Sequence, residues 1–474
     1  MNLLSLWFGL EAPVSRRDYA LSGVGLMTLK VAIDNGIAYA ATGKPWPLGA
    51  YIVPDMVWKS NALDGGAANA VSGAALVAMA LVALPFLWIG VTMTIRRAAN
   101  AGKSPWLGIL FLVPFVNYVT MLIFAVLPPA KRDDKWVPVP LGPFRRSPET
   151  PPLSEAGPVP PGLQSALLGL LSPIVLGTAM AVFSIKGMAV YGGALFFATP
   201  FVMGLTTAVL YNRKHLRSLG TTLGLALLSI GLCGLVLLLF AFEGILCIMM
   251  AAPIAAVIAL LGALVGYALA SQGKMRMRNA ALMVAALPAL GGVEATVAEP
   301  TLREVETVVE IDAPPEQVWK NVVGFSDLPA PPQWFFQLGI AYPMRATITG
   351  EGVGAVRNCE FSTGPFVEPI TVWDPPRRLG FDVESQPPSM TELSPYQKID
   401  APHLEGYMVS KRGEFRLVPL PGGRTRLEGS TFYTLSIYPE GYWVVWGELL
   451  LHAIHGRVLE HIKNLTEHPA AITG

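Results

Sequence analysis

Charged residues and cysteines are both scarce in this chain of 474 residues. Only 14% of the residues are Asp, Glu, Lys or Arg, whereas an average soluble domain carries about 25%. With 52% hydrophobic residues, this composition excludes a disordered chain and argues against a protein that is soluble throughout. Three cysteines are too few for a disulfide framework.

The sequence also lacks a Gly-rich phosphate-binding motif and a basic stripe of the kind that binds nucleic acid. Its formal net charge of +1 hides an asymmetry. Residues 301–474 hold 14 Lys and Arg against 21 Asp and Glu, while residues 1–300 hold 20 against 12. We therefore expect a basic, apolar front part, an acidic C-terminal part and no nucleic-acid partner.

Long apolar windows fill the front part. A helix needs about 20 mostly apolar residues to cross a bilayer, and lipid forces such segments to be helical. The windows are 19–41, 70–94, 105–127, 163–185, 189–211, 220–242 and 245–270. We therefore expect a multi-pass membrane protein, with membrane lipids as partners.

The positions of Lys and Arg predict the topology of these windows. Placing every basic cluster in the cytoplasm pairs six windows into three hairpins. The window 105–127 then enters and leaves on one side, as a re-entrant pair broken near Pro114. The alternative, a full span, would place the basic cluster at 213–217 on the wrong side.

Composition divides the chain into five segments. A membrane module, 1–130, is followed by a linker, 131–162; the stretch 128–162 holds 11 prolines and cannot bury a core. A second helical module of about four spans covers 163–270. Residues 271–300 contain a basic run and a short apolar segment. If 279–298 crosses the membrane, as we favour, the C-terminal domain at 301–474 lies outside the cytoplasm; otherwise it is cytoplasmic.

The first module resembles the small membrane family DUF805. The resemblance rests on Ser15-Arg16-Arg17-Asp18-Tyr19 and on the run from Arg96-Arg97 to Trp106. Ala99-Asn100 stands where the family typically has a His-Asp pair. The resemblance implies a location in the bacterial inner membrane and no known reaction. We interpret the double arginines as interfacial anchors that face lipid headgroups.

From residue 301 the pattern changes to alternation, which predicts strands. We expect strands near 304–312, 345–350, 354–362, 369–373, 379–384, 413–419 and 425–434, with a hairpin loop at 420–424. A long helix is expected at 440–467, because apolar residues recur there at spacings of three and four. This order predicts an α+β fold in which an antiparallel sheet wraps on a long C-terminal helix.

The C-terminal segment resembles the START-like helix-grip superfamily, also called SRPBCC or polyketide cyclase/dehydrase-like. The motifs are Val309–Trp319, Gly352–Arg357 and Trp373–Leu379. Members bind lipids, sterols, hormones or polyketides between sheet and helix, and a minority are enzymes. The resemblance implies a hydrophobic or amphipathic ligand, possible enzymatic action on it, or a regulatory or interaction module without catalysis.

An apolar cavity with a few polar groups is the typical binding site. We expect the lining to come from large aromatic and polar side chains of this domain and from the long connection at 386–409, which we interpret as a lid. The predicted ligand-binding residues are Trp334, Phe336, Glu360, Trp373, Tyr396, His403, Tyr433 and Trp446.

The sequence presents no complete catalytic set, so we expect a binding protein rather than an enzyme. If the domain is an enzyme, Glu360 or Glu428 with Tyr433 would supply the acid and base. Glu448, His452 and His455 share a helix face, but their spacing differs from that of known zinc motifs. We therefore expect no metal and no cofactor.

Overall fold

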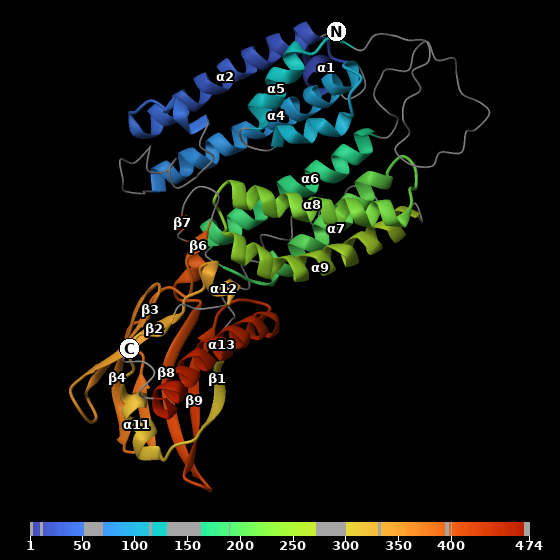
Figure 1. Ribbon diagram of the computed structural model, residues 1–474. Helices are drawn as coiled ribbons and strands as arrows, with labels where there is room; N and C mark the ends of the chain where they lie inside the picture. The colour runs from blue at the N-terminus through green and yellow to red at the C-terminus, as the bar shows by residue number, and fades with distance from the viewer. Residues whose placement is uncertain are drawn as a thin grey trace.

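The computed structural model describes residues 3–9, 13–51, 70–112, 116–129, 163–188, 190–271, 300–329, 333–393, 398–399 and 401–468. The described chain forms two helical modules that lie side by side and a C-terminal α+β domain that meets one end of the second module (Figure 1). The predicted linker 131–162 and the apolar segment 279–298 lie outside the described residues.

The N-terminal module contains two long helices and several short ones. Its elements are α1 (Leu3–Phe8), α2 (Arg16–Thr42), η1 (Leu48–Tyr51), α4 (Ala70–Asn100), η2 (Pro105–Leu112) and α5 (Val116–Val126). The window 105–127 thus forms two short helical pieces, η2 and α5. At 1.5 Å per residue the 11 residues of α5 extend about 16 Å, half of a bilayer core. Each piece alone is too short to cross a bilayer core, and the re-entrant interpretation of this window stays a prediction.

The interpretation of the double arginines as anchors for lipid headgroups is wrong for Arg96 and Arg97. Arg16 and Arg17 are exposed, but Arg96 and Arg97 are 1% and 0% exposed. Arg96 donates to the carbonyls of Leu6 and Gly9 at the end of α1. Arg97 donates to the carbonyls of Phe124 and Leu127 at the end of α5. Each guanidinium satisfies helix-terminal carbonyls that have no partner within their own helix, where a cation is also favoured by the helix dipole.

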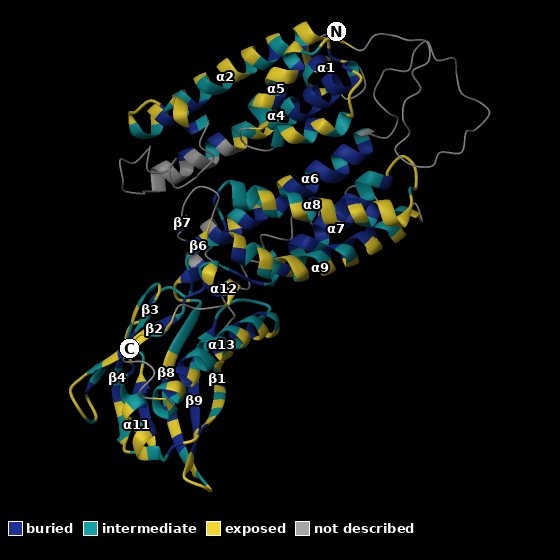
Figure 2. Ribbon diagram, viewed as in Figure 1, coloured by how far each residue is buried: buried dark blue, intermediate teal, exposed yellow. Residues whose placement is uncertain are grey.

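The second module is a bundle of long helices, α6 (Leu163–Val182), α7 (Thr199–Asn212), α8 (Leu219–Leu239) and α9 (Ile245–Ser271). Two π-helical turns, η3 (Phe183–Met188) and η4 (Ala194–Ala198), connect α6 to α7. With α4, these elements supply five helices in the described chain that are long and apolar enough to cross a membrane. Figure 2 shows exposed residues along the outer face of α9, and they include Val257, Leu261 and Val265. An apolar face without protein cover is typical of contact with lipid.

Glycines allow α7 and α9 to pack closely. A Cβ on Gly262 would lie 2.0 Å from the Phe201 carbonyl oxygen, and one on Gly266 would lie 2.6 Å from that of Leu205. Both distances are far below contact, so only glycine fits at these two positions. The Gly262–Gly266 spacing is therefore used as a helix-packing motif.

The C-terminal domain confirms the predicted α+β fold. Its antiparallel sheet has the strand order β1-β9-β8-β5-β4-β3-β2. The strands are β1 (Leu302–Ile311), β2 (Pro343–Thr349), β3 (Val356–Phe361), β4 (Gly364–Asp374), β5 (Arg378–Asp382), β8 (Met408–Leu420) and β9 (Arg424–Leu435). Gly422 and Gly423, both at positive φ, form the hairpin turn between β8 and β9.

The long helix α13 (Glu440–Glu467) lies across the concave face of this sheet. Short elements complete the domain: α11 (Pro315–Val323), α12 (Trp334–Gln337), the two-residue strands β6 (Glu392–Leu393) and β7 (Lys398–Ile399), and η5 (Pro402–Leu404). The core between sheet and helix includes Ile311, Leu379, Leu427 and Ile462, all fully buried.

A buried ion pair sits inside this core. Arg357 on β3 pairs with Glu368 on β4, and their side chains are 2% and 8% exposed. The guanidinium also lies over the rings of Phe325, Phe381 and Phe415 at 5.2–5.6 Å. Burial raises the pKa of the Glu368 carboxyl, and the neighbouring guanidinium offsets part of that rise.

Replacing Arg357 by Met should destabilise the C-terminal domain by about 3–5 kcal/mol, because the Glu368 carboxylate would be left buried without its partner. The melting temperature of the full chain in detergent, followed by tryptophan fluorescence, measures this loss. Arg378→Met is the control, because Arg378 pairs with Glu414 on the exposed face and should cost at most about 1 kcal/mol. Equal losses in the two variants would contradict the assignment.

Candidate functional site

The space between the sheet and α13 is small. It measures about 110 Å³ and is lined by Phe381, Phe415 and Leu459, with the Arg357–Glu368 pair inside. Ligand pockets usually measure about 300–1,000 Å³. The interior of the helix-grip domain is therefore largely filled by its own side chains.

A larger cavity lies where the C-terminal domain meets the helical bundle. It measures about 250 Å³. The bundle contributes residues from η3 and from the facing ends of α6, α7, α8 and α9, including Ile185, Met203 and Leu237. The C-terminal domain contributes Trp443 and Trp446 from α13, among others. The lining is almost entirely apolar, as in most sites for small molecules.

Apolar packing holds the two parts together around this cavity. One cluster joins Ile185 and Phe196 of the bundle to Leu435 and Trp443 of the domain, and the rings of Phe196 and Trp443 lie 4.9 Å apart. A second cluster joins Leu246 at the start of α9 to domain residues such as Phe336, Met390 and Leu404. The backbone N–H of Tyr438 donates to the Tyr191 carbonyl at 2.8 Å.

The described parts of the connection 386–409 take part in this docking. The elements β6, β7 and η5 come from it and lie beside the end of the bundle (Figure 1). This segment, which we predicted to be a lid, contacts the membrane module through Met390, Ile399 and Leu404.

One end of the cavity is polar. Glu243 lies in the turn between α8 and α9, and Cys247 lies in the first turn of α9. His403 of η5 meets both: its Nε2 lies 2.7 Å from Cys247 Sγ, and its Nδ1 lies 3.5 Å from Glu243 Oε2. All three residues line the cavity. We call them, together with Tyr191 and Glu392, the junction cluster.

The hydrogen bonds of Tyr191 indicate the tautomer of His403. Tyr191 donates its hydroxyl proton to Glu243 Oε1 at 2.6 Å. The Tyr191 oxygen therefore accepts at 3.2 Å from His403 Nδ1–H. In a neutral imidazole the other nitrogen, Nε2, then carries a lone pair directed at Cys247 Sγ, where it can accept the thiol proton.

Glu392 adds a second carboxylate from the C-terminal domain. Glu392 is 0% exposed. Oε1 accepts from the backbone N–H of Cys247 at 3.1 Å and lies 3.8 Å from His403 Nε2. Oε2 has no hydrogen-bond partner among the residues that the structure describes. A Cβ on Gly244 would lie 1.7 Å from this oxygen, so the carboxylate packs directly on the glycine backbone.

The predicted ligand-binding residues are distributed over several places. Trp446 and His403 line the junction cavity. Tyr433 and Phe336 are buried in the two apolar clusters that join domain and bundle. Trp373 packs against the core of the C-terminal domain, with its ring edge-on to Trp319.

Trp334 and Glu360 lie outside both cavities. Trp334 is 62% exposed on α12. Glu360 forms an ion pair with Arg345 across β2 and β3 at 2.8 Å and faces away from the interior. Its strand neighbours Arg357 and Cys359 alternate with it and point inward, as a period of two requires. The predicted residue Tyr396 lies outside the described residues.

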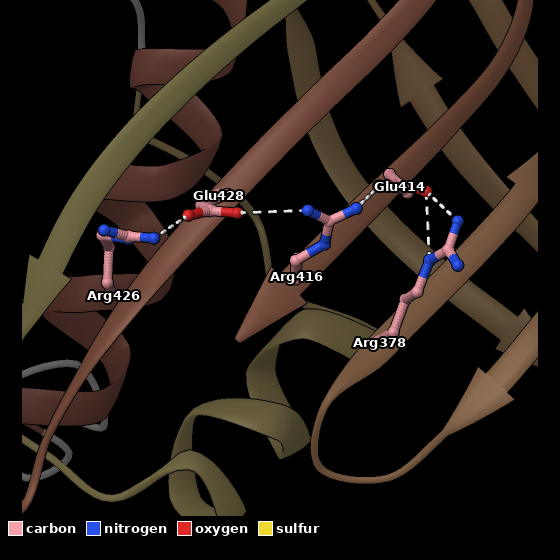
Figure 3. A network of polar contacts seen from close by, with 5 residues as sticks. All are labelled: Arg378, Glu414, Arg416, Arg426 and Glu428. Atoms are coloured by element: carbon pink, nitrogen blue, oxygen red, sulfur yellow. Dashed lines mark hydrogen bonds and ion pairs between the residues drawn. The ribbon is translucent and has the colours of Figure 1, made fainter. Parts of the chain in front are cut away.

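The acid–base set proposed from the sequence does not assemble. Tyr433 is buried beside the junction, whereas Glu428, five residues earlier on β9, points to the opposite face of the sheet. Figure 3 shows Glu428 between Arg416 and Arg426, in a ladder that continues to Glu414 and Arg378. Glu360 and Glu428 thus form ion pairs with arginines on the outer face of the sheet and do not face a cavity with Tyr433.

The helix face with Glu448, His452 and His455 makes hydrogen bonds instead of a ligand set. Thr307 Oγ1 lies 2.8 Å from His452 Nδ1 and 3.1 Å from His455 Nδ1. Thr431 lies 2.8 Å from His455 Nε2. Burial, followed by repulsion from His452, lowers the pKa of His455 to about 4, so this imidazole is neutral at pH 7.

Sequence reasoning missed Tyr191, Glu243, Cys247 and Glu392. Glu243 and Cys247 are 4 positions apart, but Glu392 follows Cys247 by more than 140 positions. No spacing motif therefore connects the residues of the cluster. One signal was present: Glu243 is the only acidic residue in the apolar block 163–270. An ionisable residue in such a block is costly and is usually functional.

Comparisons with known proteins agree with the two-part organisation. Residues 303–465 match the family model described as polyketide cyclase/dehydrase and lipid transport. Residues 13–138 match the family model of a protein of unknown function, DUF805. Both resemblances seen in the sequence are thereby confirmed. No curated protein matches the chain.

Similar solved structures cover about a third of the chain. They include a protein from Nitrosospira multiformis (15% identity, 36% of this chain and 99% of that chain, TM-score 0.23). Norcoclaurine synthase from Thalictrum flavum shows 12% identity over 36% of this chain and 98% of its own, with a TM-score of 0.24. The Zhui aromatase/cyclase from Streptomyces sp. R1128 shows 16% identity over 37% and 99%, with a TM-score of 0.23.

Replacing Gly244 by Ala should weaken the docking of the C-terminal domain, because the added Cβ overlaps the Glu392 side chain. Overpacking of this kind costs about 1–3 kcal/mol. We expect faster release of the C-terminal domain by limited proteolysis of the full chain in detergent. Gly441→Ala is the control, since a Cβ there meets no atom within 4 Å. Identical cleavage of the two variants would contradict the packing.

Proposed function

We propose that this multi-pass membrane protein binds a hydrophobic or amphipathic small molecule, such as a lipid, in the junction cavity. The main support is the position of the cavity: one wall comes from helices long and apolar enough to cross a membrane, and the other wall comes from the C-terminal domain. The match of that domain to a family that includes lipid transport supports the same ligand class.

The distribution of polarity favours an amphipathic ligand. The walls formed by Met203, Leu237 and Trp446 are apolar, whereas Glu243 and His403 lie at one end. An apolar chain would contact the walls and a polar group would face the junction cluster. The volume of about 250 Å³ suits one short chain or part of a longer one, because it lies just below the usual range of about 300–1,000 Å³.

A route from the bilayer is available on α8. Gly231 lines the cavity and is also an exposed residue within the candidate span Leu219–Leu239. A ligand that enters beside Gly231 would pass from the lipid-facing side of the bundle into the cavity. We therefore favour a molecule taken from the membrane over one taken from water.

We further infer that the C-terminal domain lies on the extracytoplasmic side of a bacterial inner membrane. The loop with Arg213, Lys214 and Arg217 joins α7 to α8 at one end of the bundle. The turn with Glu243 and the cavity lie at the other end, where the C-terminal domain docks (Figure 1). Short loops rich in Lys and Arg stay in the cytoplasm, which leaves the docked end outside.

Replacing Gly231 by Leu should reduce ligand occupancy about tenfold or more, because filling the entrance removes contacts worth at least about 1.4 kcal/mol. Mass spectrometry of lipids that copurify with the full chain in detergent measures the occupancy. Gly224→Leu is the matched control: it lies two turns away on the same helix, with open space around its Cβ. If wild type and both variants carry the same lipids in the same amounts, the cavity is not the binding site.

The topology is tested in sealed inverted vesicles of the bacterial inner membrane. A protease added outside should leave the C-terminal domain intact, because that domain faces the vesicle lumen. After the vesicles are opened with detergent, the same protease should cleave it. Cleavage before detergent is added would place the domain in the cytoplasm and contradict the inferred orientation.

A further inference from the structure

The junction cluster contains the ligand types that zinc prefers. One ligand atom from each of Glu243, Cys247 and His403 lies within 4.8 Å of the other two. Thiolate sulfur, imidazole nitrogen and carboxylate oxygen are the protein ligands of Zn²⁺. Among the described residues this is the one such group of three or more, and neither histidine of the face with Glu448 belongs to it.

The hydrogen bonds around His403 prepare it to bind a metal. Nδ1–H donates to the Tyr191 oxygen, and Tyr191 in turn donates to Glu243. Histidine ligands of zinc typically donate their second nitrogen in this way, which fixes the ring and its tautomer. The remaining nitrogen, Nε2, directs its lone pair toward Cys247 Sγ.

Glu392 supplies an independent sign of a missing partner. It is fully buried, and its Oε2 has no hydrogen-bond partner in the described part of the chain. Its other oxygen lies 3.8 Å from His403 Nε2. Burying a carboxylate is costly unless it is paired or coordinates a metal. A cation between Sγ and Nε2 would lie next to this carboxylate.

Binding a metal at Nε2 requires Cys247 and Glu243 to adjust. Two ligands at about 2.0–2.3 Å from a tetrahedral zinc lie about 3.3–3.7 Å apart. The Nε2 to Glu392 Oε1 distance of 3.8 Å is near this range, while the Nε2 to Sγ distance of 2.7 Å would have to widen by roughly 1 Å. Glu243 Oε2 lies 3.5 Å from Nδ1, the other nitrogen of the ring, so it would also have to move toward a metal bound at Nε2.

The geometry points to a zinc site formed by Cys247 Sγ, His403 Nε2 and the carboxylates of Glu243 and Glu392. Two ligands come from the helical bundle and two from the C-terminal domain. The metal therefore fastens the domain to the membrane module at the polar end of the junction cavity. Metal that binds the docked state also stabilises it.

Metal content of the full chain, purified in detergent without chelator, tests the site. We expect about one zinc ion per chain in wild type, and at least about tenfold less in Cys247→Ala and in His403→Gln. The matched controls Cys359→Ala and His452→Gln should keep the metal. The His452 variant also tests the helix face with Glu448 and His455, because loss of zinc there would move the site and overturn the proposal.

Cobalt provides a second readout on the wild-type fold. After the metal is removed by a chelator, Co²⁺ should give the near-ultraviolet band of a cobalt–thiolate bond, and Zn²⁺ should abolish it. Zinc should also protect Cys247 from alkylation and raise the melting temperature of the wild type, but not of Cys247→Ala. No metal uptake by the wild type, or alkylation of Cys247 at the same rate with and without zinc, would overturn the site and favour a metal-free Cys–His pair.

The metal site and the ligand cavity can fail separately. Gly231→Leu should lose the copurifying lipid and keep its zinc, because Gly231 is on α8, away from the four ligands. A wild-type chain that holds zinc without any lipid supports the metal site and contradicts the proposed ligand binding. A wild-type chain that holds lipid but binds no zinc after loading supports the proposed ligand binding and contradicts the metal site.

Discussion

The organisation of this protein depends on how it buries polar groups in apolar surroundings where two parts of the chain meet. Glu243 and Glu392 are 6% and 0% exposed, and each belongs to a different part. Glu243 accepts from Tyr191 of its own module and lies 3.5 Å from His403 Nδ1 of the C-terminal domain, while Glu392 accepts from the backbone of Cys247 across the junction. A buried charge without partners costs several kcal/mol. Docking of the two parts is therefore favoured, because it brings the buried carboxylates into contact with polar partners.

The same docking creates the cavity. The helix-grip domain fills most of its own interior, where the Arg357–Glu368 pair and the surrounding rings leave only about 110 Å³. The larger space of about 250 Å³ exists only between domain and bundle. A helix-grip domain isolated from its membrane module would present Trp443 and Trp446 to solvent. The unit that carries the proposed function is therefore the pair of modules.

Buried arginines also pair with buried polar groups in two other places. Arg96 and Arg97 satisfy carbonyls at the ends of α1 and α5, and Arg357 sits among three aromatic rings beside Glu368. In each case a guanidinium reaches a specific acceptor in the described part of the chain. Arginine suits these positions because its rigid fork of donors remains charged when buried.

Several features could be predicted from the sequence because they depend on local pattern. The alternation at 304–312 and the apolar spacing at 440–467 gave β1 and α13, since side-chain period and backbone geometry are linked. The Gly-rich loop at 420–424 gave the β8–β9 hairpin. Apolar length predicted five helices that are long and apolar enough to cross a membrane, because bilayer thickness sets the length of a spanning helix.

The candidate site was predicted only in fragments. His403 and Trp446 were chosen as polar and aromatic residues of a domain expected to hold a ligand, and both line the junction cavity. Trp334 and Glu360 were chosen by the same reasoning and are on the surface. Residue type does not reveal which strand face a side chain occupies unless the register is known.

What the sequence determined by itself was the nature of each segment: apolar helices, an alternating sheet and a long closing helix. Only the tertiary structure decided that Cys247 and Glu243 lie against His403 and Glu392. The physical reason is that periodicity records the environment along one element, while a site between modules depends on contacts between residues about 150 positions apart, which no local pattern encodes.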